Sequence, residues 1–113
     1  MAKAQAGLLW PAEDGDMFTT IRKYRVRRGS VEELARRVQD GFVPLVRQMQ
    51  GFKAYYLIEN GSEELTTISV FSSADEALAS NEKAADWVRS NVLESTRGMP
   101  EVIVGNVLIA EIK

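Results

Sequence analysis

The feature of this sequence that most constrains its fold is an Asn-Gly pair between two runs of strand-forming residues. The runs are Phe52 to Ile58 (FKAYYLI) and Leu65 to Phe71 (LTTISVF), and Asn60-Gly61 lies between them. Both runs are rich in aromatic and β-branched residues, and Asn-Gly readily adopts the positive-φ conformations of a tight hairpin turn. The two runs are therefore predicted to be neighbouring antiparallel strands.

A strand and a helix are predicted before this hairpin. Met17 to Val26 has the composition of a strand. Ser30 begins a helix, because Glu33 follows at the spacing of a capping box. Apolar residues continue at helical spacing as far as Met49, so we expect one helix, or two nearly collinear pieces, bent near Pro44, whose ring removes a backbone donor.

A second helix and a last strand are predicted after the hairpin. Ser73 stands three residues before a glutamate, a second capping box, and opens a helix that should run to about Asn91 or Leu93. Gly98 and Pro100 then break the chain, and the last strand is expected from Glu101 to Ile112. The element order β-α-β-β-α-β is that of a ferredoxin-like α+β fold with a four-stranded antiparallel sheet.

The last strand is apolar on both faces, which has a consequence for assembly. One side carries Val102, Val104, Leu108 and Ile112, and the other carries Ile103, Val107 and Ile109. Two helices cover only one face of such a sheet, and an uncovered antiparallel face normally carries polar residues. We expect a second copy to cover it, so that a homodimer forms a dimeric α/β barrel. The alternative cover is the N-terminal segment, with Leu8, Leu9 and Trp10.

Residues 1–16 show neither helical nor strand periodicity, and we expect a flexible N-terminal tail before one domain at residues 17–113. The apolar run in this tail is too short for a signal peptide or a membrane span. A net charge of -2 gives no general attraction to nucleic acid or to anionic membrane. The expected location is cytoplasmic, with no nucleic-acid or membrane partner.

The chain has no cysteine and no histidine. It therefore has no imidazole base and no thiolate nucleophile, and it lacks the ligands of ordinary zinc and copper sites. We expect no cofactor and no metal. This composition removes a large part of enzyme chemistry, and any metal would have to be a hard one bound by carboxylates.

Several phrases resemble one known family. These are GFVPLVRQMQGFKAYYLIENG, SNEKAADWV in the second helix and PEVIVGNVLIAEI at the end. Over Met17 to Lys113 the chain resembles the antibiotic biosynthesis monooxygenase (ABM) family of dimeric α/β barrels. The resemblance implies oxidation of polycyclic phenols by dioxygen without a cofactor, although many members have no assigned reaction.

The haem-degrading branch of this family resembles the chain only in part. That branch carries a functional Trp where this chain has Trp87, but it also needs a histidine after this helix, and this chain has none. Arg22 stands where that branch places an Asn. Haem degradation is therefore not expected.

Two polar residues are the candidates for chemistry. Arg22 shares a strand face with apolar residues. Asn81 lies in the middle of an apolar stripe of the second helix that is expected to face the sheet and consists of Ala74, Leu78, Ala85, Val88 and Val92. A buried amide without a partner costs about 1 to 3 kcal/mol, so Asn81 either bonds a neighbouring backbone group or faces a ligand. Arg22 either finds a partner or extends to the surface. Asn81→Leu should lower stability in the structural case, and leave it unchanged or raise it in the ligand-facing case.

The functional hypothesis is a cofactor-independent monooxygenase that acts on a small electron-rich aromatic of the phenol, anthrone or quinol type. Asn81 and Arg22 would polarise the substrate oxygen, and Tyr24, Tyr56 and Trp87 would bind the ring. The alternative is a non-catalytic module that binds a small molecule or serves in assembly. An isomerase or decarboxylase is disfavoured because the sequence shows no obvious proton carrier.

Overall fold

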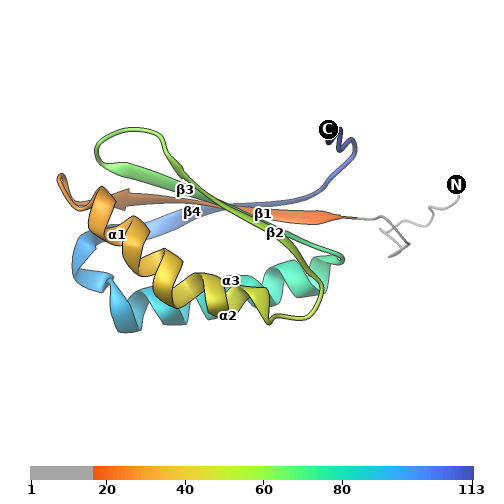
Figure 1. Cartoon of the computed structure of the whole chain (residues 1–113), viewed down its shortest axis with the longest axis horizontal. Helices are drawn as coiled ribbons and strands as arrows, with labels where there is room; N and C mark the ends of the chain where they lie inside the picture. Colours follow the sequence, from red (N-terminus) through yellow and green to blue (C-terminus); the bar gives the residue numbers. More distant parts are fainter. Residues whose placement is uncertain (1–16) are drawn as a thin grey trace, which may run out of the picture.

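Four strands form one antiparallel sheet in the computed structural model, which describes residues 17–113 (Figure 1). The strands are β1 (Phe18–Val26), β2 (Phe52–Glu59), β3 (Glu64–Phe71) and β4 (Thr96–Asn106). Their order across the sheet is β2-β3-β1-β4, so the two strands that follow the helices lie at the edges. The predicted ferredoxin-like α+β fold is confirmed. The tail expected at residues 1–16 lies outside the described residues.

The hairpin between β2 and β3 is closed as the sequence predicts. Gly61 adopts a φ of 140°, and the backbone N–H of Asn60 donates to the carbonyl oxygen of Glu64 over 3.4 Å. The Asn60 side chain also accepts a hydrogen bond from Thr66, which holds the turn against the first residues of β3.

The first helical region contains a wider turn in the middle. It consists of α1 (Val31–Arg37), a π-helical segment η2 (Val38–Phe42) and α2 (Val43–Arg47). The N–H of Val43 donates to the carbonyl of Val38, five residues back, directly before the proline expected to disturb the helix. The predicted cap is wrong, because the Ser30 hydroxyl donates to the carbonyl of Arg27 instead of capping α1.

The second helix, α3 (Ala74–Asn91), is capped as predicted, since the Ser73 hydroxyl accepts from the N–H of Glu76 over 3.2 Å. Its buried face is rotated from the predicted stripe. The buried residues are Ala77, Ser80 and Ala84, whereas Leu78 is 50% exposed. The small side chains on this face let α3 approach the sheet closely. The buried face of the helix is therefore the one that packs most closely, and not the one with the largest apolar side chains.

The last strand starts and ends earlier than the sequence suggests. After η3 (Leu93–Ser95), β4 includes both residues that were expected to break the chain. Gly98 takes a φ of 72° where the pairing of β1 with β4 is irregular, and an edge strand tolerates Pro100. Because β4 ends at Asn106, the apolar residues that follow do not belong to a sheet face, contrary to the prediction.

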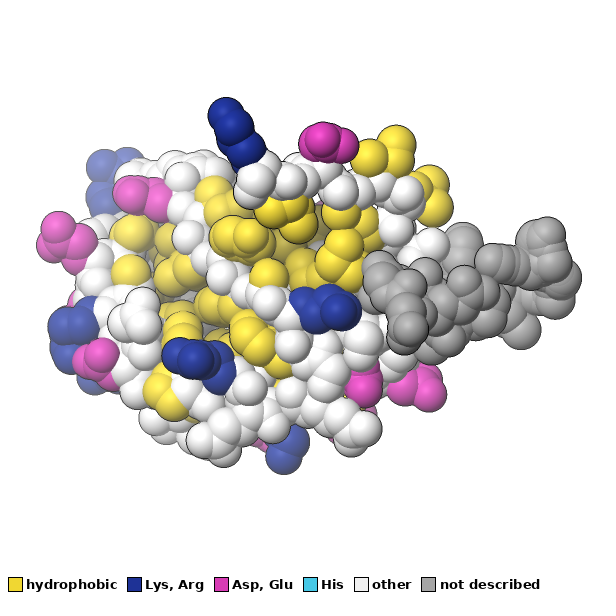
Figure 2. All heavy atoms as spheres, turned by 45° about the vertical axis from the view of Figure 1, so that its right-hand side comes forward, with side chains coloured by type: hydrophobic (Ala, Val, Ile, Leu, Met, Phe, Trp, Pro, Cys, Tyr) yellow, Lys and Arg dark blue, Asp and Glu magenta, His cyan; other side chains and the backbone are white. Residues whose placement is uncertain are grey.

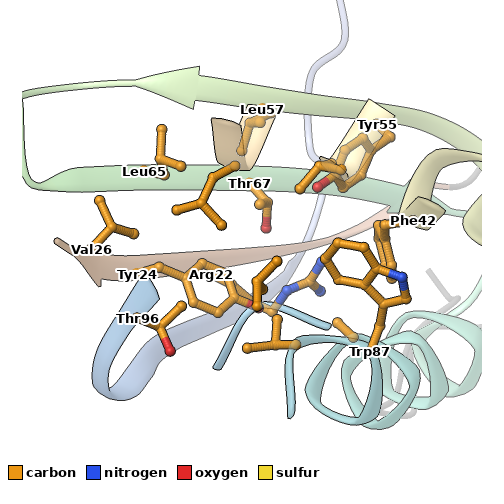
Figure 3. Close-up of a pocket in the computed structure, with 15 residues that line it drawn as sticks. Arg22, Tyr24, Val26, Phe42, Tyr55, Leu57, Leu65, Thr67, Trp87 and Thr96 are labelled. Atoms are coloured by element: carbon orange, nitrogen blue, oxygen red, sulfur yellow. The ribbon is translucent and has the colours of Figure 1, made fainter. Parts of the chain in front are cut away.

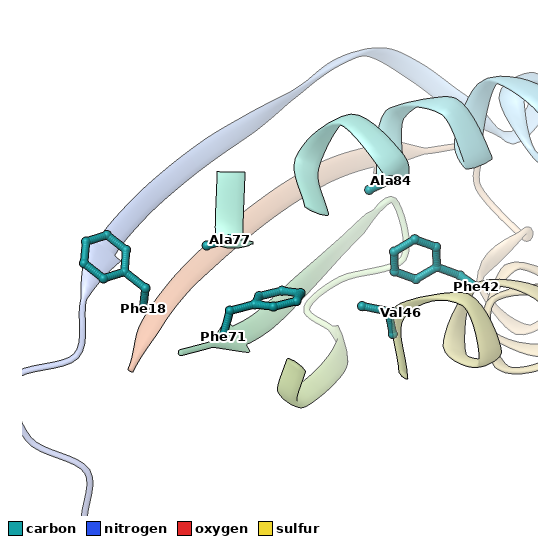
Figure 4. Close-up of a cluster of buried hydrophobic side chains, with 6 residues drawn as sticks. All are labelled: Phe18, Phe42, Val46, Phe71, Ala77 and Ala84. Carbon is teal, nitrogen blue, oxygen red and sulfur yellow. The ribbon is translucent and has the colours of Figure 1, made fainter. Parts of the chain in front are cut away.

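Two buried clusters fill the space between sheet and helices. The first joins the residues labelled in Figure 4: Phe18, Phe42, Val46, Phe71, Ala77 and Ala84. The second, nearer the other end of the sheet, is made of Val26, Leu34, Leu65 and Val92. Trp87 packs against both clusters, so this side chain marks the place where they meet.

The other face of the sheet has no helix over it (Figure 1). A row of four apolar residues crosses it from β2 to β4, because Tyr56 pairs with Ile68, Ile68 with Ile21, and Ile21 with Ile103. Tyr56 and Ile103, at the two ends of this row, are more than half exposed. We call these four residues the open-face row. Exposed apolar side chains also gather over a broad area of the side shown in Figure 2.

None of the helices within residues 17–113 has both the length and the apolar composition needed to cross a membrane.

Candidate functional site

Four polar side chains lie together on the helix-covered face of the sheet. Arg22 of β1 is opposite Thr67 of β3, and Thr20 is opposite Ser69, so the four occupy two adjacent cross-strand pairs. All four are at least 96% buried. We call them the polar patch. Side chains in directly opposed strand positions lie within about 5.5 Å of each other at Cβ, so the patch is one continuous polar surface under the helices.

Arg22 is the centre of this patch. One terminal nitrogen of its guanidinium, Nη1, donates to Oδ1 of Asn81 over 2.8 Å, and the other, Nη2, lies 3.5 Å from the Ser69 hydroxyl. Its third nitrogen, Nε, is buried and has no hydrogen-bond partner among residues 17–113, and the same holds for Oγ1 of Thr67. Within residues 17–113 no carboxylate forms an ion pair with Arg22, so its charge is buried among neutral groups. The expectation that this side chain might extend to the surface is wrong, because it is only 2% exposed.

A small cavity of about 40 Å³ lies beside Arg22, between the sheet and the helices (Figure 3). Arg22 reaches it from β1, Trp87 from α3, and Tyr55 and Thr67 from β2 and β3. Most of the other lining side chains are apolar: Val26, Leu34, Val38, Phe42, Leu57, Leu65, Ala84, Val88 and Val92. The exposed surface of the cavity is thus almost entirely apolar, although its lining residues include one cation, Arg22, and four residues with hydroxyls, Tyr24, Tyr55, Thr67 and Thr96.

Three of the five predicted site residues line this cavity, namely Arg22, Tyr24 and Trp87. Tyr56 does not. It belongs to the open-face row on the other side of the sheet and is 58% exposed, while its neighbour Tyr55 lines the cavity. The sequence showed that these two tyrosines point to opposite faces, but not which of them faces the helices.

Asn81 contacts Arg22 without lining the cavity. Its Oδ1 accepts hydrogen bonds from Arg22 and, over 2.9 Å, from the Thr20 hydroxyl. The amide oxygen therefore accepts hydrogen bonds from two side chains of β1. This role differs from both roles that the sequence suggested, a bond to a neighbouring backbone group and contact with a ligand. Its position makes it a support for the guanidinium.

An aromatic wall closes the cavity on the side of the first helical region. The Trp87 indole lies 5.7 Å from the Phe42 ring, and Phe42 lies 5.5 Å from the Tyr55 ring, both in tilted pairs. Gly41, in the π-helical segment, permits this packing, because a Cβ there would lie 3.0 Å from an indole carbon. The π-helical turn thus places a glycine, which has no side chain, against the Trp87 indole.

Burial raises the pKa of the Tyr55 hydroxyl, and the positive charge of Arg22 opposes this rise only in part. Tyr55 is therefore a neutral phenol at neutral pH and does not act there as a base. The other tyrosine in the cavity wall is Tyr24. No histidine exists in the chain to take a proton.

We predict that this raised pKa lowers the free energy of unfolding at alkaline pH. An unfolded tyrosine ionises near pH 10, but folded Tyr55 keeps its proton, so stability should fall as the pH rises above about 10. Tyr55→Phe should lose less stability between neutral pH and pH of about 10.5 than the wild type does. Urea denaturation at both pH values measures the difference, and equal losses in the two proteins would contradict the assignment.

The described residues contain no group of three or more acidic side chains placed to hold a metal ion. Sequence reasoning missed Thr67 and Ser69 in the site, and of the two adjacent tyrosines it chose Tyr56, whereas Tyr55 lines the cavity. A signal for the first two was present, because they alternate with Leu65 and Phe71 and so interrupt an apolar strand face with hydroxyls.

The fold is similar to several solved structures. A protein of unknown function from Nitrosomonas europaea superposes with a TM-score of 0.73 at 15% identity, covering 87% of this chain and 95% of that one. A putative antibiotic biosynthesis monooxygenase from Bordetella bronchiseptica gives 0.71 at 18% identity, covering 83% and 99%. The ActVA-Orf6 monooxygenase of Streptomyces coelicolor, solved with nanaomycin D, gives 0.70 at 12% identity, covering 89% and 96%.

At these identities the similarity concerns the fold. No curated protein matches the sequence significantly. The family model for antibiotic biosynthesis monooxygenases matches residues 17–89, which include β1 to β3, most of α3 and the whole polar patch. The chain therefore belongs to the antibiotic biosynthesis monooxygenase family.

Proposed function

We propose that the protein is a cofactor-independent monooxygenase acting on a small electron-rich aromatic of the phenol, anthrone or quinol type. The observation that supports this most is the buried cation Arg22, which is one of the residues lining an apolar cavity and has no carboxylate partner among the described residues. Family membership and the fold shared with the ActVA-Orf6 monooxygenase support it further.

The reaction requires few catalytic groups from the protein. An anthrone loses a proton from its CH₂ group, and the carbanion combines with dioxygen to give a peroxide anion. Protonation and loss of water then leave a ketone, so that one oxygen atom enters the product and the other leaves as water. The protein has to favour the anion, and a guanidinium in an apolar site does so through charge and hydrogen bonding.

The size of the cavity sets a condition on this proposal. A space of about 40 Å³ holds only a few waters, whereas an engineered cavity of about 150 Å³ binds benzene. A substrate ring must therefore displace part of the wall. The half-buried Trp87 and the π-helical segment beside it are the parts of the wall that we propose to move.

We predict that the purified, metal-stripped protein consumes oxygen when given anthrones or hydroquinones, and that Arg22→Met lowers this rate at least about 100-fold, the scale seen for loss of one oxyanion donor. An oxygen electrode measures the rate. Arg25→Met is the matched control, since it removes an exposed arginine of the same strand and should keep the wild-type rate.

The second candidate is a module that binds a small molecule without turnover. The residues that line the cavity favour this candidate, because none of them is a base of ordinary strength that starts a reaction. Substrate binding without oxygen consumption would support this candidate. Equal rates for the wild type and Arg22→Met would contradict the oxygenase.

We also propose that the protein is a homodimer in which two open faces pack together. The apolar open-face row needs a cover, and a twofold axis offers each row to its copy. Tyr56 would then lie in the subunit interface, while each subunit keeps its own cavity under the helices.

A further inference from the structure

We propose that a surface groove beside β2 is the outer half of the ligand-binding site, and that it takes an elongated apolar ligand with one anionic end, held by Arg47. The inner half is the small cavity, which the ligand reaches when the wall between the two spaces opens. The inference rests on the proposed function only in placing a ligand in that cavity. It does not require turnover.

The groove lies between the first helical region and β2, the strand at one edge of the sheet. Its volume is about 640 Å³, which is in the range of small-molecule sites, whereas the cavity measures about 40 Å³. The groove therefore has the room for a ligand that the cavity lacks. One side is a row of helical residues spaced four apart, and the rest of the lining is apolar or aromatic: Ala35, Gln39, Val43 and Arg47, then Val38, Phe52, Tyr55 and Leu57.

A thin wall separates the groove from the cavity. Val38, Tyr55 and Leu57 line both spaces, so a single layer of side chains lies between them. All three residues are only half-buried. Figure 3 shows Tyr55 and Leu57 on β2 at the border of the cavity. Displacing these side chains would join the two spaces without unfolding a helix or a strand.

The wall is made of parts that can move at low cost. Val38 begins the π-helical segment, whose wider turn is less regular than an α-helix. The Tyr55 hydroxyl has no hydrogen-bond partner among residues 17–113, so a rotation of this side chain breaks no such bond there. The Tyr55 ring does contact Phe42 in a tilted pair. An apolar ring of the ligand would replace this contact.

Arg47 determines which end of the ligand stays in the groove. It is exposed, and among the described residues that line the groove it is the only charged one. Arg36 and Arg37 of the same helical region both pair with Glu33, whereas Arg47 pairs with no carboxylate within residues 17–113. A second, more open concavity continues past Arg47 over α2 and also has no carboxylate in its lining. A cation beside apolar surface suits a ligand with an apolar body and an anionic end.

The test is a fluorescence titration of the full-length protein with two dyes of similar shape, anilinonaphthalene sulfonate and the neutral N-phenylnaphthylamine, which lacks the sulfonate. Both dyes fluoresce when they leave water for an apolar site. Arg47→Met should weaken the anionic dye about threefold to fivefold, the scale of an exposed ion pair, and leave the neutral dye unchanged. Arg25→Met is the matched control, because Arg25 lines neither space and should change neither affinity.

Leu57→Ala tests the wall. If the ligand has to displace the wall, a smaller side chain removes part of that cost, and both dyes should bind several-fold more tightly. If the dyes stay outside the wall, the same change removes a contact and weakens them. Leu57→Val should shift both affinities in the same direction by less, and it serves if circular dichroism shows that Leu57→Ala is unfolded.

The double variant with lysine at Tyr56 and Ile103 distinguishes the groove from the open face of the sheet, and it should keep the site for the neutral dye. Loss of that site, weaker binding to both Leu57 variants, an equal effect of Arg47→Met on the two dyes, or binding of neither dye would overturn the proposal. A change of the dimer dissociation constant in Arg47→Met would also overturn it, because a second copy would then occupy the groove. These titrations need no reaction with oxygen, so failure of the oxygenase does not affect their outcomes.

Discussion

Replacing Tyr56 and Ile103 together with lysine is expected to convert a dimer of this protein into a folded monomer. Both side chains are more than half exposed in the single subunit, so lysines there should not disturb its core. In a twofold contact between open faces, the same changes place four positive charges in an apolar interface. We expect the dissociation constant to rise at least about 100-fold, equivalent to about 2.7 kcal/mol.

Light scattering across a range of concentrations measures this change, and circular dichroism shows that the subunit remains folded. Leu78→Lys is the matched control, because Leu78 is equally exposed on the outer side of α3 and should leave the dimer intact. A stable interface of this kind should bury more than about 1,000 Å². A wild-type protein that is monomeric at micromolar concentration would refute the open-face contact.

The fold was predictable because the signals for it are local. Alternation and the Asn60-Gly61 turn define the hairpin, and the cap at Ser73 places the second helix. The errors occur where packing overrides local pattern. Ser30 turns its hydroxyl to the preceding loop, and β4 continues through Gly98 because an edge strand accepts an irregular residue.

The site was less predictable because it depends on strand register. The sequence identifies Arg22 as a charge on an apolar face, but the pairing that sets Thr67 opposite it joins two residues 45 positions apart in the chain. Asn81 was recognised as unusual, but its partners lie on β1, far away in the chain. The types of the side chains therefore indicated that Arg22 and Asn81 were unusual. Only the paired strands show that Arg22 lines the cavity and that Asn81 supports Arg22 from outside it.

Asn81→Leu is expected to destabilise the protein, by about 1 to 3 kcal/mol. Oδ1 of Asn81 accepts from both Arg22 and Thr20, and leucine accepts nothing, so a buried cationic donor loses its shortest hydrogen bond. This geometry favours the structural outcome of the two that the sequence left open. Urea denaturation measures the loss. Asn81→Asp, which keeps the acceptor and adds a counter-charge beside Arg22, should retain stability.

A double-mutant cycle separates support of Arg22 from simple packing by Asn81. If Asn81 acts through the guanidinium, Asn81→Leu should cost much less in an Arg22→Met background, because methionine has no charge or donor left to satisfy. The loss of stability that remains in the Arg22→Met background reports the lost hydrogen bond from the Thr20 hydroxyl. This loss should be small, because a hydroxyl rotates to another acceptor or to water more easily than a buried guanidinium moves. An equal cost in both backgrounds would contradict the coupling. A smaller cost in the Arg22→Met background would show that Asn81 stabilises the fold through the guanidinium of Arg22.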